Sequence, residues 1–340
     1  MEKAYNYSDI YLVPRYSRLR SRLEADPSID FLGRKWAGNW CPANMESVIN
    51  LDIAKWLSFN NYFYIYHRFH GASKQLLQKS RAESWPFVSI SIGVKDEDRQ
   101  LIQDIKASKC RVDCITIDIA HFDSINGREM TEYVKNELPD VKLIGGNIAT
   151  QEAAFNAELW GCDCVKIGIG GGGICSTKNM TSFHVPMLTT VLNCSTSKLK
   201  IDAIYDGGVR ENADIIKATW ASLKKNTDRL PMIMCGGLIA ACTDAPGDNI
   251  YSNSKVTQTV LDPKESKGSV THKRYWGSSS VRQKDGEKKN IEGFETQIVC
   301  NGMTVKEKYQ EIKESIQSAV SYSGSDNLFG LSNVSAVCVK

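Results

Sequence analysis

A run of glycines that ends in a cysteine is the feature of this sequence with the clearest chemical use. An apolar run over residues 164–170 leads into three more glycines, then Ile174, Cys175, Ser176 and Thr177. A cysteine thiolate is a strong nucleophile, and a hydroxyl two residues away can carry a proton to or from a reacting group. We therefore predict that Cys175 attacks an electrophilic carbon with Thr177 beside it. The alternative is a buried structural thiol, the role we assign to the other ten cysteines.

The same glycines, Gly168, Gly170 and Gly173, also spell the G-x-G-x-x-G pattern of a dinucleotide-binding turn. That turn requires a helix directly after the glycines and an acidic residue about 20 positions later. Cys175 follows instead, and residues 188–195 contain no acid, so we reject this interpretation. Glycines without side chains can still direct backbone groups at a phosphate or a cation.

Polar residues and glycines also follow other apolar runs. Residues 206–208 read Asp-Gly-Gly and residues 235–237 read Cys-Gly-Gly, which offers unobstructed amides to a phosphate and a carboxylate to ribose hydroxyls. Asp118 ends a third run, and Glu292 follows a polar stretch, where a carboxylate on a closing loop can complete an acid–base pair. Tight turns and solvated charges are the alternatives for these residues.

The elements that must position these residues are short apolar runs alternating with helical patterns. Runs such as VSISIG and CITIDI are apolar throughout, which is typical of parallel strands buried on both faces. The expected strands are residues 39–44, 62–68, 87–93, 114–120, 141–147, 164–170, 201–208 and 231–237, with helices at 96–107, 124–138, 151–159 and 212–224. Eight such units predict an α/β protein with a (β/α)8 TIM barrel, whose active site forms at the carboxyl ends of the strands. A doubly wound open sheet is the alternative.

Two polar stretches, residues 243–273 and 278–289, interrupt this rhythm after the eighth expected strand. Long loops in a compact domain are usually lids or binding loops. We therefore expect one catalytic domain over residues 1–340, with residues 243–292 forming lid and flap loops over the barrel mouth and no inserted regulatory domain.

Composition excludes several other classes of protein. The formal net charge is only +3, so neither nucleic-acid binding nor adsorption to a membrane surface is expected. No apolar run reaches the ~18 residues of a spanning helix, and the first residues lack a signal core. Eleven scattered cysteines without a signal segment indicate reduced thiols, which predicts a cytoplasmic protein.

The order of the motifs along the chain resembles that of the IMP dehydrogenase/GMP reductase family, and of its reductase branch in particular. The matching segments are NYSDIYLVP, PANMESV, FYIYHRF, SISIGVKDED, ITIDIAH, GGNIAT, VKIGIGGGGICSTK, YDGG, CGG, YWGSSS, GEKKNIEG and QSAVSYSG, which span nearly the whole chain. The resemblance implies a homotetrameric barrel that converts GMP to IMP and ammonia with NADPH. Cys175 would form a thioimidate at purine C2, and Thr177 and Glu292 would handle the protons of the departing amine.

The resemblance also implies three sets of binding residues. The substrate would contact Asp206, Gly207, Gly208, Gly236, Gly237, Gly277, Ser278, Ser279, Lys289 and Gly293. The cofactor would contact Ser21, Arg22, Arg68, Asp118, Ile119 and Ala120, with Ser318, Ala319, Val320 and Ser321 supplied by a neighbouring subunit. The carbonyl groups of Gly170, Gly172 and Cys175 would form a loop for a monovalent cation such as K⁺.

Within the family, IMP dehydrogenase is the alternative, with IMP converted to XMP and NAD as oxidant. It usually carries a regulatory domain after the second strand, where this chain has only about twenty residues between Arg68 and Phe87. It also needs a flap Arg-Tyr pair to activate water, and Arg282 is followed here by Gln283. Gly171, Gly173 and the long segments 216–235 and 243–273 depart from the family pattern around the phosphate site. They leave a deoxy- or modified guanine nucleotide open as the substrate, and a non-catalytic nucleotide-binding barrel is the alternative outside enzymes.

Overall fold

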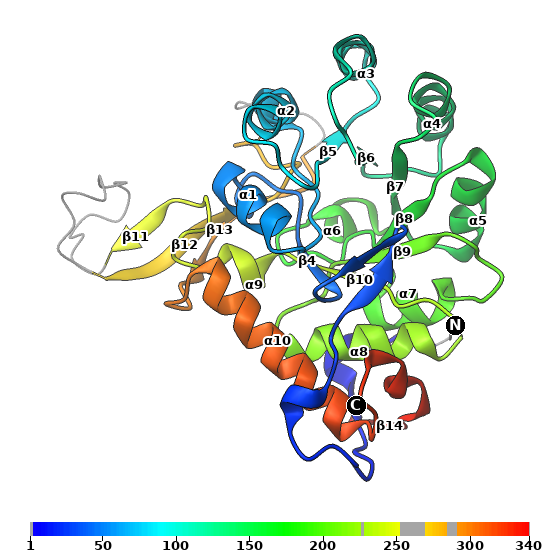
Figure 1. Cartoon of the computed structure of the whole chain (residues 1–340), viewed down its shortest axis with the longest axis vertical. Helices are drawn as coiled ribbons and strands as arrows, with labels where there is room; N and C mark the ends of the chain where they lie inside the picture. The colour runs from blue at the N-terminus through cyan, green and yellow to red at the C-terminus, as the bar shows by residue number, and fades with distance from the viewer. Residues whose placement is uncertain (1–2, 226–227, 252–268, 284–290, 340) are drawn as a thin grey trace.

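A curled sheet of parallel strands forms the centre of the molecule. The computed structural model describes residues 3–225, 228–251, 269–283 and 291–339. Seven parallel strands lie in the order β4-β10-β9-β8-β7-β6-β5, and helices surround the curled sheet (Figure 1). The strands are β4 (Trp40–Pro42), β5 (Ser89–Ile92), β6 (Cys114–Asp118), β7 (Lys142–Ile148), β8 (Cys164–Ile167), β9 (Asp202–Asp206) and β10 (Met232–Cys235).

Several of the helices around the sheet begin at a residue whose side chain caps the first turn. Asn50, Ser124 and Thr150 each accept a hydrogen bond from the backbone N–H three residues on, which satisfies an otherwise unpaired donor at the first turn. The helices are α1 (Leu51–Phe59), α2 (Ala72–Ala82), α3 (Asp96–Ser108), α4 (Ile125–Glu137), α5 (Gln151–Trp160), α6 (Thr177–Thr181), α7 (Met187–Cys194), α8 (Asn212–Leu223), α9 (Gly237–Ala240) and α10 (Val305–Tyr322).

The α/β barrel class predicted from the sequence is confirmed, with one difference in the strands. The expected strand at residues 62–68 pairs with β5 through Tyr66 alone, which donates to Ser89 O at 3.1 Å and accepts from Ser91 N at 3.0 Å. Its side chains Phe63, Tyr64 and Ile65 are nevertheless fully buried. Segment 62–68 therefore contributes to the core as a strand would, while its backbone forms a single bridge.

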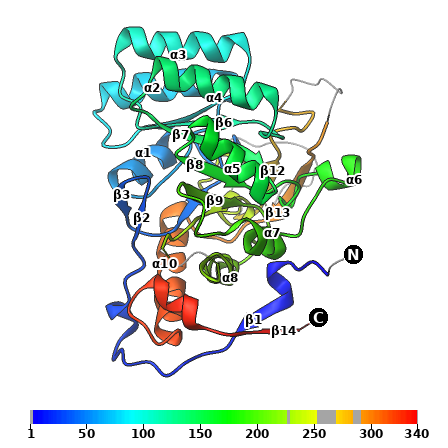
Figure 2. The same ribbon diagram turned by 90° about the vertical axis from the view of Figure 1, so that its right-hand side faces the viewer.

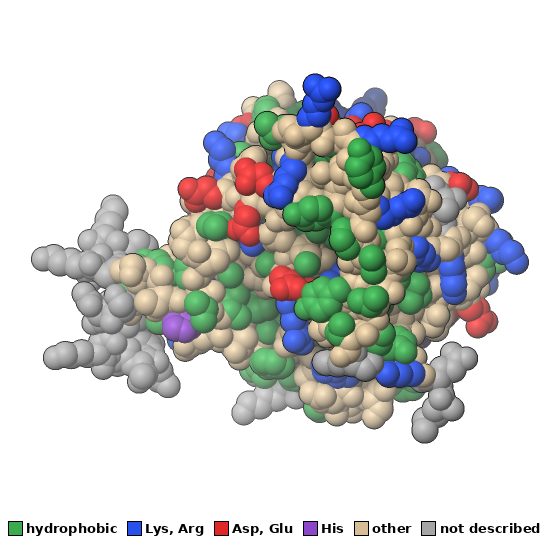
Figure 3. Space-filling model, turned by 90° about the horizontal axis from the view of Figure 1, so that it is seen from below, with side chains coloured by type: hydrophobic (Ala, Val, Ile, Leu, Met, Phe, Trp, Pro, Cys, Tyr) green, Lys and Arg blue, Asp and Glu red, His purple; other side chains and the backbone are tan. Residues whose placement is uncertain are grey.

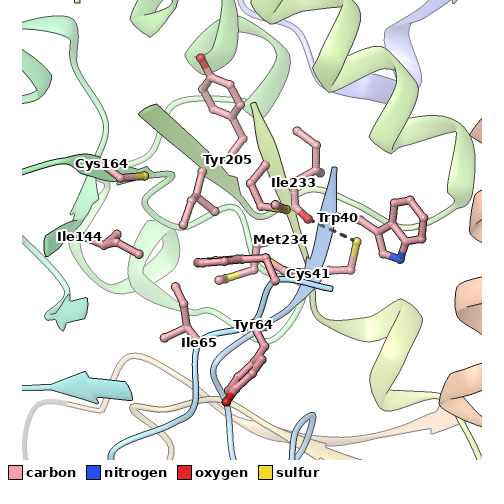
Figure 4. Packing of buried hydrophobic residues seen from close by; sticks show 14 of the residues in the cluster. Trp40, Cys41, Tyr64, Ile65, Ile144, Cys164, Tyr205, Ile233 and Met234 are labelled. Carbon is pink, nitrogen blue, oxygen red and sulfur yellow. Dashed lines mark hydrogen bonds between the residues drawn. The ribbon is translucent and has the colours of Figure 1, made fainter. Parts of the chain in front are cut away.

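Alternate residues of each strand face the barrel interior or the outer helices. In Figure 4, Ile144, Cys164 and Met234 point toward the centre of the barrel, whereas Tyr205 points away from it. The Tyr205 hydroxyl lies 2.6 Å from Ser195 Oγ at the end of α7, which fixes the strand against the helical layer. Trp40 packs against Tyr309 of α10 with ring centroids 5.6 Å apart.

A small antiparallel sheet projects from the barrel beside α9 (Figure 1). It contains β11 (Asn249–Tyr251), β12 (Val270–Trp276) and β13 (Glu295–Val299), with β12 in the middle. The sequence interpretation placed only loops over residues 243–292. Strands occupy part of that stretch, and residues 252–268 and 284–290 lie outside the described ranges.

The two ends of the chain meet at the face opposite α2 and α3 (Figure 2). There β1 (Ile10–Leu12) pairs antiparallel with β14 (Ala336–Cys338), and β2 (Ile29–Phe31) forms a hairpin with β3 (Arg34–Trp36). The described residues also include the short 3-10 helices η1 (Tyr7–Asp9), η2 (Arg22–Glu24), η3 (Phe69–Gly71) and η4 (Leu328–Asn333). Hydrophobic side chains gather over the middle of the face seen in Figure 3. Within the described residues, no helix has the length and apolarity needed to cross a membrane.

Candidate active site

A pocket at the carboxyl ends of the barrel strands collects most of the residues that the sequence singled out. Its volume is about 230 Å³. The predicted residues in its lining are Arg68, Asp118, Ile119, Ala120, Gly170, Gly172, Cys175, Thr177, Asp206, Gly207, Gly208, Gly236, Gly237, Gly277, Ser278, Ser279, Glu292 and Gly293. In a barrel of this class, catalytic groups are carried at this end of the strands.

A chain of hydrogen bonds links three of these residues. The Cys175 thiol donates to Thr177 Oγ1 at 3.1 Å, and the Thr177 hydroxyl donates to Glu292 Oε2 at 2.7 Å. The thiol, the hydroxyl and the carboxylate therefore form a continuous path along which a proton can pass from sulfur to carboxylate.

Backbone pairing holds Glu292 in that position. Cys175 forms an antiparallel bridge with Gly293. Ser176 N donates to Glu292 O at 2.8 Å, and Phe294 N donates to Ile174 O at 3.2 Å. The segment around Glu292 is thus attached, on both sides of the carboxylate, to the cysteine loop, which is residues 168–176 between β8 and α6.

Asp206 ends β9 and faces two donors that the sequence analysis missed. Lys166 Nζ lies 3.0 Å from Asp206 Oδ2, and Asn147 Nδ2 donates to the same oxygen at 2.9 Å. Asn147 lies where the register between β7 and β8 shifts, between Gly146 and Ile148. A lysine inside the apolar run CVKIGIG was the available signal, because a buried ammonium requires anionic partners.

The Gly236-Gly237 turn is closed on one side by Tyr275 of β12, a third residue that the sequence analysis missed. A Cβ on Gly236 would lie 2.5 Å from the Tyr275 hydroxyl, so only glycine fits there without displacing the ring. Burial, reinforced by Asp206, raises the pKa of Tyr275 and keeps this hydroxyl protonated. The aromatic residues before the GSSS segment were its sequence signal.

Asp118 and Arg68 also line the wall of the pocket. Burial alone would raise the pKa of Asp118, but the positive charges of Lys166 and Arg68 lower it, so the carboxylate stays ionised. Lys166 Nζ is 3.0 Å from Asp118 Oδ1. This wall therefore presents a fixed anion beside a guanidinium.

Six of the predicted cofactor residues lie elsewhere, at the start of η2 and in the last turns of α10, two elements that contact each other. They are Ser21, Arg22, Ser318, Ala319, Val320 and Ser321, and the pocket lining includes none of them. Arg22 donates to Ser318 Oγ and to the Tyr322 hydroxyl, each at 3.1 Å. The predicted substrate residue Lys289 lies outside the described residues.

Backbone carbonyls of the cysteine loop could hold a monovalent cation. Gly170 takes the left-handed conformation with φ +73°, which the chain needs to turn here. Among the described residues, only the Gly172 carbonyl of the three predicted ligands accepts a backbone hydrogen bond, from Cys175 N at 3.2 Å. Neutral carbonyl oxygens suit K⁺, so the residues fit. No group of three His, Cys, Asp or Glu side chains in the described part of the chain could hold a metal ion.

The fold and this pocket define an α/β-barrel enzyme with a cysteine, Cys175, in the pocket at the barrel mouth. The model of the IMP dehydrogenase / GMP reductase domain matches residues 4–339, and the chain belongs to that family. Its relatives include proteins named GMP reductase from Lactobacillus gasseri (37% identical, covering 99% of this chain and 96% of that one) and Chromobacterium violaceum (35%, covering 98% of each). A third, from Shouchella clausii, is 35% identical, covering 100% of this chain and 97% of that one.

Proposed function

We propose that this chain is a GMP reductase, which converts GMP to IMP and ammonia at the expense of NADPH. The observation that carries the proposal is the continuous Cys175–Thr177–Glu292 hydrogen-bond chain inside the pocket. A protein that only binds nucleotides needs no nucleophile joined to a proton path. The full-length relatives named GMP reductase support the choice of substrate.

The three residues divide the chemistry of deamination. Cys175 sulfur attacks purine C2 while its proton passes through Thr177 to Glu292, along the 3.1 Å and 2.7 Å contacts. The C2–N bond then breaks as Glu292, acting through Thr177, returns the proton to the departing amine, because an amine leaves readily only when protonated. A thioimidate between C2 and sulfur remains.

NADPH, when bound, supplies a hydride to C2. The C2–S bond then breaks, and the electron pair returns to the Cys175 sulfur. GMP, NADPH and two protons thus yield IMP, NADP⁺ and ammonium. Arg68, Asp118, Ile119 and Ala120 would hold the nicotinamide end, since they line the same pocket as Cys175.

The remaining binding roles follow from position in the pocket. Asp206 would accept hydrogen bonds from ribose hydroxyls, and open backbone amides would bind the phosphate. The groups assigned to substrate are Asp206, Gly207, Gly208, Gly236, Gly237, Gly277, Ser278, Ser279 and Gly293, with Lys289 from the resemblance. Gly170, Gly172 and Cys175 carbonyls would hold K⁺, whose charge would fix the loop that carries the nucleophile.

A homotetramer would complete the cofactor site. Ser21, Arg22 and residues 318–321 lie apart from the pocket, so we propose that they bind the distal end of NADPH in a neighbouring subunit. Exposed Tyr16 and Leu23 lie on the same terminal segment as Arg22, with 85% and 81% of their surface accessible, and support an interface there. We further propose that residues 1–340 act as one catalytic domain in the cytoplasm, and the eleven cysteines scattered singly along the sequence support that location.

IMP dehydrogenase activity is disfavoured by the position of Arg282. The guanidinium stacks over the Trp276 ring at 4.0 Å from its centroid and bonds Asp248 at 2.9 Å and Glu295 at 3.3 Å. An arginine engaged in this way is not available to activate water.

A substrate screen tests the proposal. Purified protein is incubated with NADPH and GMP, dGMP or a modified guanine nucleotide, and separately with IMP and NAD or NADP. We expect NADPH oxidation and ammonia release with GMP. Reduction of NAD with IMP would establish the dehydrogenase instead, and absence of turnover in every arm would refute the proposed function.

A further inference from the structure

Lys166 connects two acidic residues that line the pocket, Asp118 and Asp206. Its Nζ lies 3.0 Å from Asp118 Oδ1 on β6 and 3.0 Å from Asp206 Oδ2 on β9. The side chain is 4% exposed, so these bonds form in a region nearly free of water. One ammonium is therefore shared by two carboxylates that belong to different subsites of the proposed enzyme.

The neighbouring strand is built to allow this bridge. β7 lies between β6 and β8 in the sheet, so Lys166 must pass over β7 to reach Asp118. A Cβ on Gly146 of β7 would come within 2.5 Å of Lys166 Cβ. Because glycine has no side chain, it leaves the space that the lysine occupies.

The bridge through Lys166 continues to a positive charge, Arg68, on the Asp118 side and to a neutral amide, Asn147, on the Asp206 side. Arg68 acts on Asp118 from one end, and Asn147 donates to Asp206 Oδ2 at 2.9 Å from the other. Removing one partner from such a buried set leaves an uncompensated charge, so the groups must adjust as a unit. A ligand that orders Asp206 thereby also orders the shared ammonium and Asp118.

We propose that Lys166 is a positioning residue that couples the nucleotide subsite at Asp206 to the cofactor subsite at Asp118, so that each ligand tightens binding of the other. The proposal rests on the proposed function, since it takes GMP and NADPH as the two ligands. Once a ribose fixes Asp206, Lys166 holds Asp118 in one position, and part of the ordering cost of cofactor binding is already met. By thermodynamic reciprocity, the cofactor must tighten nucleotide binding by the same factor.

The experiment measures NADPH affinity with and without saturating GMP in the Cys175→Ala protein, where chemistry is blocked. We expect GMP to lower the Kd of NADPH by about fivefold or more, within the usual range of coupling between sites. The coupling is measured as the ratio of the NADPH Kd without GMP to the Kd with saturating GMP. In Lys166→Met on the same background, that ratio should fall to about one. Lys166→Arg should retain most of it, because a guanidinium can still bridge both carboxylates.

Lys217→Met is the matched control. Lys217 has the same 4% exposure and also lies near two carboxylates, Asp214 at 3.7 Å and Glu211 at 3.8 Å, but it belongs to α8 outside the pocket lining. Its loss should weaken the fold and leave the ratio unchanged. If Lys166→Met fails to fold in a urea titration, Asp118→Asn replaces it and should also bring the ratio to about one.

The outcomes separate this inference from the proposed function. The coupling is overturned if the Kd ratio is one in the Cys175→Ala protein, or if it survives in Lys166→Met (in Asp118→Asn where Lys166→Met does not fold). Binding of GMP and NADPH in these experiments would still leave the proposed reductase intact. Failure of the Cys175→Ala protein to bind either ligand counts against the proposed function itself.

Discussion

The Thr177 hydroxyl donates a 2.7 Å hydrogen bond to Glu292, although 115 positions separate the two residues in the chain. The bond exists because the segment around Glu292 pairs with the cysteine loop through Ser176 N and Phe294 N. The proton path of the proposed reaction therefore depends on backbone pairing between two distant segments.

Removing the nucleophile should abolish turnover while leaving nucleotide binding in place. In Cys175→Ala, no atom can attack C2, so we expect no NADPH oxidation above background, while Asp206 and the glycine amides still bind GMP. Steady-state assays and a direct GMP titration check both parts. Cys110→Ala, a change at a partly exposed thiol outside the pocket lining, should keep activity. Mass spectrometry of the wild-type protein with GMP should reveal an adduct on Cys175, and an adduct on another cysteine would contradict the assignment.

Thr177 and Glu292 should behave as one unit. Thr177→Val removes the hydroxyl that joins the thiol to the carboxylate, and Glu292→Gln removes the carboxylate, so each should lower kcat by about 100-fold or more. Because either change interrupts the same path, the double variant should be about as slow as the slower single variant. Measured kcat values for the four proteins complete the cycle. Additive losses would mean that the two residues act separately.

Replacement by alanine should destabilise the protein at Gly168 of the cysteine loop and leave its stability nearly unchanged at Gly173. Gly168 has φ +142°, and a Cβ there would lie 1.9 Å from the Asp206 carbonyl oxygen, so Gly168→Ala must push β8 and β9 apart. We expect a loss of about 1–3 kcal/mol in the free energy of unfolding, together with a higher KM for GMP. At Gly173 nothing lies within 4 Å of a Cβ, so Gly173→Ala should change stability by less than about 0.5 kcal/mol. Urea titrations compare the two, and equal stabilities would contradict this account of the loop.

Several barrel strands were predictable because they are short apolar runs buried on both faces, as in Ser89–Ile92 and Met232–Cys235. The strands β11 and β13 were not, because their residues are only partly buried or exposed and their sequences resemble polar loops. Segment 62–68 shows the opposite error, since its buried aromatic residues suggest a full strand where only Tyr66 pairs.

The site was predictable to the extent that residues carried their own signal. Cys175 and the glycine pairs sit at the ends of recognisable strands, so their meeting at one edge follows from the fold. The bridge from Lys166 to Asp118 crosses β7, and no spacing along the chain encodes that contact. The approach of Tyr275 to Gly236 likewise depends on a sheet that the sequence did not reveal.

His67 should make the fold sensitive to acid. Its side chain is buried, with Nδ1 lacking a hydrogen-bond partner among the described residues. Burial lowers the pKa of His67 to about 4; the nearby charge of Glu46 opposes this shift, and that of His70 adds to it. In the unfolded chain the same group titrates near its ordinary value of about 6.5.

Between these two values the unfolded chain binds more protons than the folded protein, so stability is complete above about pH 6.5 and declines as the pH falls toward about 4. Wild-type protein should therefore lose about 2 kcal/mol more than His67→Gln when the pH drops from about 7.5 to about 5. Urea titrations of both proteins at the two pH values measure this difference. Acidic groups with lowered pKa, such as Asp163, contribute equally to both proteins and cancel in the comparison. Parallel losses in the two proteins would show that His67 is protonated in the folded state.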